Sequence, residues 1–191
     1  MLNSNSLQTS SPKVFRLLSQ RVSLTDLERI CIVYGTVIKL NITETPWVNR
    51  DDGASYNPLP ARICELLILE GLVTDSNTLI SALLSLLDPP HMDLEGIGPN
   101  ILQDAETSHL MLQGLASKTS DPSPSAQLII LARSLDTVRH LHISSLSKEQ
   151  QNEKVSVIKA RVIPAIKAPQ CGRLLKMLQS AINIFERRNR N

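Results

Sequence analysis

Four potential metal ligands lie close together in the middle of the chain, directly after a long apolar segment. Asp88, His91, Asp93 and Glu95 fall within eight residues of one another. Carboxylates and neutral imidazoles are donors that bind divalent cations in proteins, so this cluster is one candidate metal site. The alternative interpretation is a loop between two helices, which is polar because it faces water.

Other candidates for chemistry are few. His140 and His142 are two positions apart, so on a helix they point in different directions and do not share a metal ion. The chain has no glycine-rich phosphate loop, no GxSxG segment and no Cys–His pair at a catalytic spacing. Its three cysteines are far apart and odd in number, which indicates buried, reduced thiols in a cytoplasmic protein: Cys31, Cys64 and Cys171.

The composition is typical of a helical globular protein. Of the 191 residues, 42% are hydrophobic but only 3% are aromatic, so aliphatic side chains must fill the core. So few aromatic residues argue against a surface that stacks nucleic-acid bases. The net charge of +2 is too balanced to indicate a polyanionic partner. No apolar run reaches the roughly 18 residues that span a bilayer. We therefore expect an all-α protein with no nucleic-acid partner and no membrane segment.

Apolar residues recur at helical spacing through most of the chain. Residues 1–11 are rich in Ser and Asn and predict a flexible arm, whereas residues 12–191 predict a single helical domain. The almost continuous apolar segment at 79–87 indicates the centre of its core. Helices are predicted from Pro12, after Ser23 or Thr25, from Pro58, after Asp75 or Ser76, at 101–115, at 126–141, after a capping box of Ser147 and Gln150, and at 172–188.

Polar and Pro- or Gly-containing stretches separate these helices. Residues 41–56 and 116–125 predict loops for this reason. Gly71 is expected to end the third helix in the left-handed conformation, which glycine adopts at little cost. The helix that follows Ser147 is expected to reach about Ile163, and Pro164 and Pro169 are expected to flank a break before the last helix, because proline cannot continue the hydrogen-bond ladder.

Three segments between residues 50 and 145 also form a larger pattern. They are Arg50-Asp51-Asp52-Gly53 with Tyr56-Asn57-Pro58-Leu59, the apolar LISALLSL at 79–86, and LARSLDTVR at 131–139. In order, spacing and helical setting they resemble the HD-type, metal-dependent hydrolase domain that degrades guanosine tetraphosphate, of the RelA/SpoT type. The resemblance implies an HD-domain-like bundle of six to eight helices.

The metal ligands that this resemblance requires are missing. Asn57 stands where the family has a histidine, and Ser85-Leu86 stands where it has a His-Asp pair. Arg133 replaces an aspartate ligand, and Thr137 replaces an asparagine. Asn offers one neutral carbonyl, Leu offers nothing, and a guanidinium is a permanent cation. The resemblance therefore implies no bound metal and no catalysis by the family's mechanism.

The same resemblance suggests a second use for the vacated pocket. It places Arg50 and Arg133 beside the pocket, with Arg139 on the helix of Arg133, and Arg62 belongs to the same group of cations. Guanidinium groups match phosphate oxygens, so a guanine nucleotide or phosphate is a candidate ligand. The alternative is structural, with Arg133 in a salt bridge or facing solvent. The candidate ligand-binding residues are Arg50, Tyr56, Asn57, Arg133, Thr137 and Arg139.

The sequence thus predicts a non-catalytic HD-like domain, without a cofactor, that acts through protein contacts or as a nucleotide-sensing module. Exposed apolar faces on short terminal helices would suit a homodimer or another protein partner. One alternative is an active phosphohydrolase with displaced ligands, drawn from Asp88, His91, Asp93 and Asp136. Another is a helical interaction protein unrelated to this family.

Overall fold

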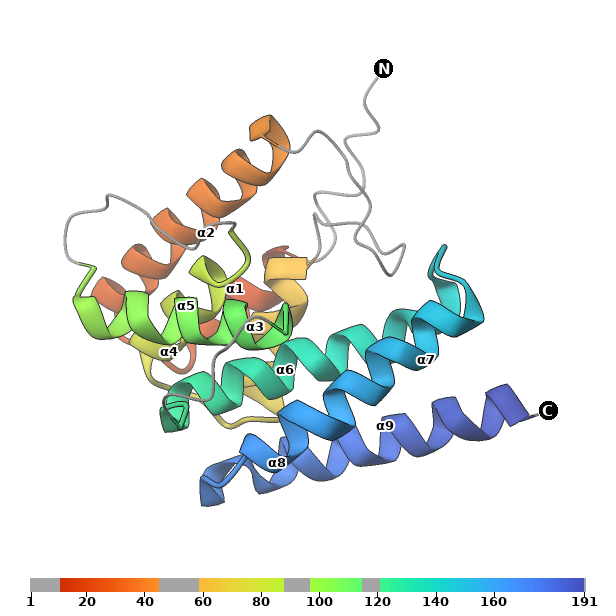
Figure 1. Cartoon of the computed structure of the whole chain (residues 1–191). Coiled ribbons are helices and arrows are strands. Elements are labelled where there is room, and N and C mark those ends of the chain that lie inside the picture. The colour runs from red at the N-terminus through yellow and green to blue at the C-terminus, as the bar shows by residue number, and fades with distance from the viewer. Residues whose placement is uncertain (1–10, 45–58, 88–96, 115–120, 191) are drawn as a thin grey trace.

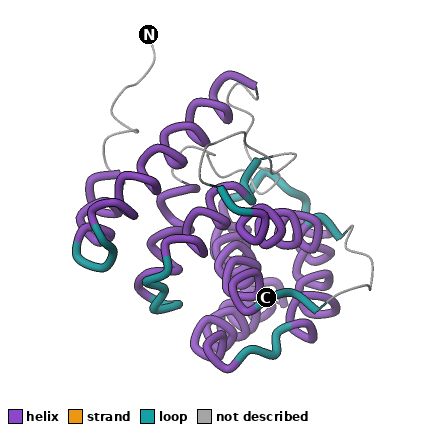
Figure 2. Tube along the Cα trace, turned by 90° about the vertical axis from the view of Figure 1, so that its left-hand side faces the viewer, coloured by secondary structure: helices purple, strands orange, loops and turns teal. Residues whose placement is uncertain are grey.

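All regular structure in the described part of the chain is helical. The computed structural model describes residues 11–44, 59–87, 97–114 and 121–190, and these ranges contain no strand (Figures 1 and 2). This confirms the prediction of an all-α fold with six to eight substantial helices. The helices of nine or more residues are α1 (Ser11–Ser19), α2 (Leu24–Glu44), α3 (Leu59–Leu69), α4 (Ser76–Leu84), α5 (Pro99–Leu112), α6 (Pro124–His140), α7 (Lys148–Val157) and α9 (Gly172–Arg190).

Two helices form the centre of the core. Every residue of α6 from 126 to 132 is buried, so this half of the helix has no face exposed to solvent. It packs against α3, α4, α5 and α9, and Figure 1 shows it crossing the middle of the molecule. Residues 78–84 of α4 are also buried throughout, as the apolar segment predicted. The core therefore centres on α4 and α6 together, and not on α4 alone.

The C-terminal part forms a layer against α6. The chain runs through α7, a π-helical turn η2 (Ile158–Val162) and the short α8 (Ile163–Ala165), then turns through the 3-10 segment η3 (Pro169–Cys171) into α9. We call α7, η2 and α8 together the α7 rod. Lys159 Nζ lies 2.8 Å from Glu186 Oε1, and the Asn189 amide donates to the Asn152 side chain, so side chains of α9 contact those of the α7 rod. Figure 1 shows the backbones of α7 and α9 on the same side of the molecule. Another 3-10 segment, η1 (Leu141–Ile143), joins α6 to this layer.

The predicted break flanked by Pro164 and Pro169 is present, because α8 ends at Ala165 and residues 166–168 are not helical. The helix still runs through Pro164 itself, because a π-helical turn lies just before it. There the Ile163 N–H donates to the Ile158 carbonyl, five residues back. A π-turn widens the helix, and this leaves room for a proline ring that would otherwise clash with the preceding turn.

Local signals placed several helix ends correctly. The Ser23 hydroxyl accepts from the Asp26 N–H, Asp75 caps α4, and Ser147 with Gln150 forms the predicted capping box. The predicted loops are shorter than expected: α2 extends to Glu44, and α6 begins at Pro124 after a Ser123 cap. Residues 45–56, and residues 1–10 of the predicted arm, lie outside the described ranges.

The prediction for Gly71 was wrong. The residue with a left-handed backbone after α3 is Leu72, with φ of 55°. Gly71 is needed for a different reason: a Cβ at this position would lie 2.8 Å from the Leu67 carbonyl oxygen and 3.3 Å from the Leu174 side chain. The glycine therefore allows close packing of the chain against α3 and α9, while the neighbouring leucine makes the turn.

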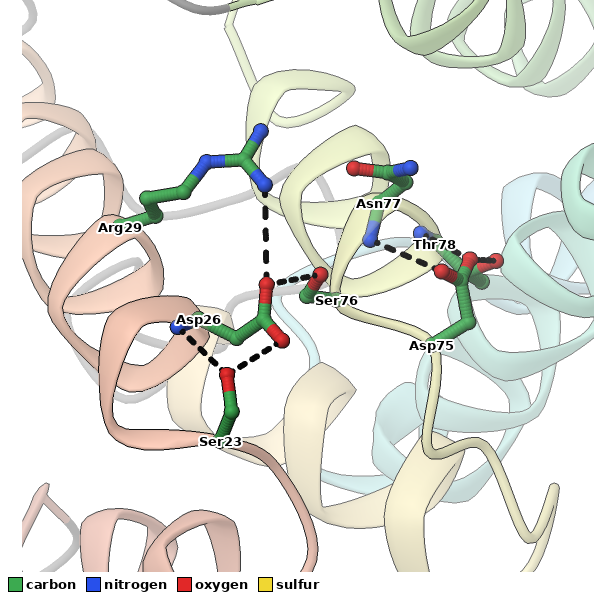
Figure 3. Close-up of polar contacts among 7 residues, drawn as sticks. All are labelled: Ser23, Asp26, Arg29, Asp75, Ser76, Asn77 and Thr78. Carbon is green, nitrogen blue, oxygen red and sulfur yellow. Dashed lines mark hydrogen bonds and ion pairs between the residues drawn. The ribbon is translucent and has the colours of Figure 1, made fainter.

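A polar contact attaches α2 to α4 at their N-termini (Figure 3). The Asp26 carboxylate accepts hydrogen bonds from the Ser23 hydroxyl at 2.7 Å and from the Ser76 hydroxyl at 2.8 Å. Ser23 belongs to the cap of α2, whereas Ser76 is the first residue of α4. We call Ser23, Asp26 and Ser76 the α2–α4 clasp. It fixes where α2 begins relative to the core.

No helix in the described part of the chain is both long enough and apolar enough to cross a membrane.

Candidate functional site

Four polar residues share one face of α6. Asp136 and Thr137 come three and four positions after Arg133, and His140 comes four and three positions after them, so all four lie on one side of the helix. We call them the α6 polar face. The contacts of Arg133 reach the end of α4, and those of Asp136 reach α3. This face therefore carries two of the predicted ligand-binding residues, Arg133 and Thr137.

Arg133 closes the C-terminal end of α4. Its Nη1 donates to the Ser85 carbonyl at 2.6 Å and lies 3.3 Å from the Ser85 hydroxyl. Ser85 is the C-cap residue of α4. The last carbonyls of a helix have no partner within it and carry partial negative charge, so a guanidinium there is stabilising. The Arg133 guanidinium thus stabilises the end of a helix.

A histidine from α5 contacts the same carbonyl. His109 Nδ1 lies 3.2 Å from the Ser85 oxygen, and the Gln113 amide nitrogen lies 2.8 Å from His109 Nε2. A carbonyl requires a donor, so these partners fit the tautomer with the proton on Nδ1. Sequence reasoning did not select His109. The sequence feature that could have pointed to His109 is its spacing of four from Gln113, which places both side chains on one face of a helix.

A buried ion pair joins α3 to α6. Arg62 Nε donates to Asp136 Oδ1 at 2.7 Å and Nη2 donates to Oδ2 at 3.1 Å. The Asp136 side chain is only 2% exposed and that of Arg62 is 21% exposed. His140 Nδ1 approaches the Asp136 carbonyl oxygen at 2.7 Å and Oδ1 at 3.5 Å. Because Arg62 engages both carboxylate oxygens, metal binding by Asp136 would have to displace a paired guanidinium.

The structure brings together some of the predicted ligand-binding residues. Arg133 and Thr137 lie on the α6 polar face, and Thr137 is half-buried. Arg139 is exposed, and its position on the helical wheel places it on another side of α6. The remaining predicted site residues lie outside the described ranges: Arg50, Tyr56, Asn57, Asp88, His91, Asp93 and Glu95.

The described residues were candidates for two kinds of chemistry, metal binding and reaction at a cysteine thiol. No group of three or more His, Cys, Asp or Glu side chains there is arranged to hold a metal ion. Cys64 and Cys171 are buried, and burial raises the pKa of their thiols to about 12 and about 11. Neither is a ready nucleophile, because the reactive form is the thiolate. The prediction of buried thiols was wrong for Cys31, which is exposed on α2; all three thiols are free.

A shallow groove lies between the α7 rod and α9. Its volume is about 490 Å³, and its lining mixes apolar and polar side chains: Asn152, Val155, Ser156, Lys159, Ala160, Phe185 and Glu186. The ion pair between Lys159 and Glu186 lies within this lining. The groove therefore brings no cluster of unpaired charge to the surface.

Comparisons with known proteins do not identify a family. No protein-family model matches the chain, and no solved structure matches it. A segment of 74 residues, 38% of the chain, is 35% identical to part of the receptor-like protein kinase HAIKU2 of Arabidopsis thaliana. The match spans 8% of that kinase, so it shows a local similarity between the two sequences. The resemblance to HD-type hydrolases remains a prediction from the sequence.

Proposed function

We propose that this chain is a non-catalytic helical domain, HD-like in plan, that acts through protein contacts. The observation that supports this most directly is the bond between Arg133 and the Ser85 carbonyl. In the proposed plan, both residues stand where an active hydrolase would have metal ligands. Here they hold the end of α4 against α6, so their contact contributes to folding.

The pairing of Asp136 supports the same proposal. A displaced-ligand hydrolase would need this carboxylate for its metal ion, but Arg62 engages both of its oxygens. We place the protein in the cytoplasm, where thiols stay reduced, and its three free cysteines are in keeping with that compartment.

The test combines metal content with thermal stability. We expect the purified protein to hold no stoichiometric divalent metal and its melting temperature to be unchanged by guanosine tetraphosphate. Metal retained through dialysis would overturn the proposal in favour of a phosphohydrolase with displaced ligands. A nucleotide-dependent rise in melting temperature that is insensitive to chelator would instead establish a nucleotide sensor.

Matched variants test whether a nucleotide-dependent rise in melting temperature comes from the predicted pocket. If a nucleotide shift occurs, Arg50→Ala and Arg133→Ala should abolish it, whereas Arg139→Ala should not. Arg139 lies on the same helix as Arg133 but is exposed on another side. The quantity compared is the shift within each variant, because Arg133→Ala is expected to lower the melting temperature by itself.

A further inference from the structure

The outward side of α2 carries a continuous exposed stripe. Its residues recur every three or four positions, which places them on one side of the helix. Leu24 and Ile32 are large apolar residues of this helix, yet they are 73% and 59% exposed. We call this set the α2 outer stripe: Leu24, Glu28, Cys31, Ile32, Gly35 and Lys39, all of them exposed.

Gly35 is the unusual member of this stripe. It lies in the interior of a 21-residue helix, where glycine is less favourable than alanine. A Cβ at Gly35 would meet nothing within 4 Å, in contrast to Gly71, where it would lie 2.8 Å from the Leu67 carbonyl. Packing among the described residues therefore gives no reason for the glycine. Close approach of a second helix does, because a missing side chain leaves a hollow beside Ile32.

We infer that the α2 outer stripe is the contact surface of a homodimer, in which the α2 helices of two copies pack antiparallel. The inference rests on the proposed function and names its partner as a second copy of this chain. A two-fold contact is self-complementary, so each feature must meet its complement on the same stripe. Ile32 of one copy fits the hollow at Gly35 of the other, and the same contact repeats across the axis.

The charges of the stripe select this register. When Ile32 is opposite Gly35, Glu28 is opposite Lys39, because both pairs are centred between residues 33 and 34. The two opposite-charge pairs therefore flank the two apolar contacts. A parallel, in-register pair would instead oppose Glu28 to Glu28 and Lys39 to Lys39, and like charges at a contact disfavour it. The charge pattern thus favours the antiparallel arrangement.

The stripe is accessible to such a partner. Figure 1 shows α2 along one side of the molecule, with α9 on the opposite side. The inner side of α2 packs on α4, and the α2–α4 clasp fixes its start, so the stripe points away from the core. A helix of this length is about 30 Å long. One helix pair of that length makes a small interface, and we therefore expect a concentration-dependent dimer.

Charge exchange tests the register. The molar mass of the full chain is measured by sedimentation equilibrium over a range of concentrations, and wild type should pass from one to two chains. Glu28→Lys alone, or Lys39→Glu alone, should raise the concentration at half-dimerisation about tenfold or more, because each creates two like-charge contacts. The double variant Glu28→Lys/Lys39→Glu should restore dimerisation close to that of wild type.

A second pair of variants tests the hollow. Gly35→Leu should abolish the dimer by filling the hollow, without lowering the melting temperature of the monomer, because the position is exposed and a Cβ there meets no atom of the described residues within 4 Å. Ile184→Glu is the matched control, since Ile184 is an exposed isoleucine on α9. It should leave the dimer unchanged.

The outcomes separate this inference from the proposed function. A chain that stays monomeric at every concentration overturns the homodimer and leaves a different protein partner open. A dimer that survives Gly35→Leu, or that the double charge variant does not restore, overturns the α2 register. Only bound metal or a nucleotide shift overturns the proposed function itself.

Discussion

The α6 polar face and the α2 outer stripe differ in what their side chains contact. On α6, Arg133 bonds to the end of α4 and Asp136 is paired with Arg62. On α2, Leu24 and Ile32 are largely exposed although they are apolar. Residue types that suggest chemistry are thus used for folding, and residues that suggest none are left facing outward. Substitutions on the first surface should change stability but not molar mass, and those on the second should do the reverse.

The largest effect is expected from Arg62→Met. The variant keeps most of the side-chain volume but leaves the Asp136 carboxylate, 2% exposed, without its guanidinium. Breaking a buried pair by removing one partner costs about 3–5 kcal/mol, and we expect a loss of unfolding free energy near the lower bound because Arg62 is partly exposed. Denaturation by urea, followed by circular dichroism, measures the loss.

The double variant Arg62→Met/Asp136→Leu is the control for this interpretation. It replaces the whole pair with apolar groups and should recover most of the lost stability, since no charge remains buried. If the single variant were as stable as wild type, the pair would not be a structural element and Asp136 would again be a candidate ligand.

A smaller effect is expected from Arg133→Met. It removes a hydrogen bond from a charged donor, and such bonds contribute about 1.5–3 kcal/mol. We expect the lower part of that range, because His109 remains beside the Ser85 carbonyl. The same urea titration applies. Arg139→Met, on an exposed part of the same helix, should change stability by less than about 0.5 kcal/mol. Equal losses in both variants would contradict the assignment of Arg133 to the end of α4.

The smallest effect concerns Ser134, an exception inside the core. Its hydroxyl is fully buried and, within the described part of the chain, has no hydrogen-bond partner. An unpaired buried hydroxyl is unfavourable, so Ser134→Ala should leave stability unchanged or raise it by about 1 kcal/mol. Differential scanning calorimetry is sensitive enough for this change. A clear loss of stability would mean that the hydroxyl has a partner and that the interior is more completely paired than described.

Local features of the fold were predictable, whereas contacts between distant residues were not. The caps at Asp75 and Ser147 follow from residue types within a few positions, and they were predicted correctly. The left-handed residue after α3 is Leu72 and not Gly71, and the need for glycine at position 71 comes from close packing against Leu67 and Leu174. Sequence periodicity carries no information about such tertiary neighbours.

The same limit applies to the candidate site. The resemblance selected Arg133, but its partner Ser85 lies 48 positions earlier in the chain. Arg62 and Asp136 are 74 positions apart, and nothing in their local sequence indicates that they pair. Their helices had to be placed side by side before a group of isolated charges became an ion pair and a helix cap.

The α2–α4 clasp determines how the start of α2 responds to acid. Hydrogen bonds from Ser23, and then from Ser76, hold the pKa of the Asp26 carboxyl below its ordinary value of 3.8. A carboxyl whose pKa is lower in the folded state than in the unfolded state stabilises the fold fully at pH values above the unfolded-state pKa. This contribution is lost as the pH falls through the folded-state pKa. The clasp therefore stays charged at neutral and mildly acidic pH. The orientation of α2 on the core, and of the face that it presents, should be the same across that whole range.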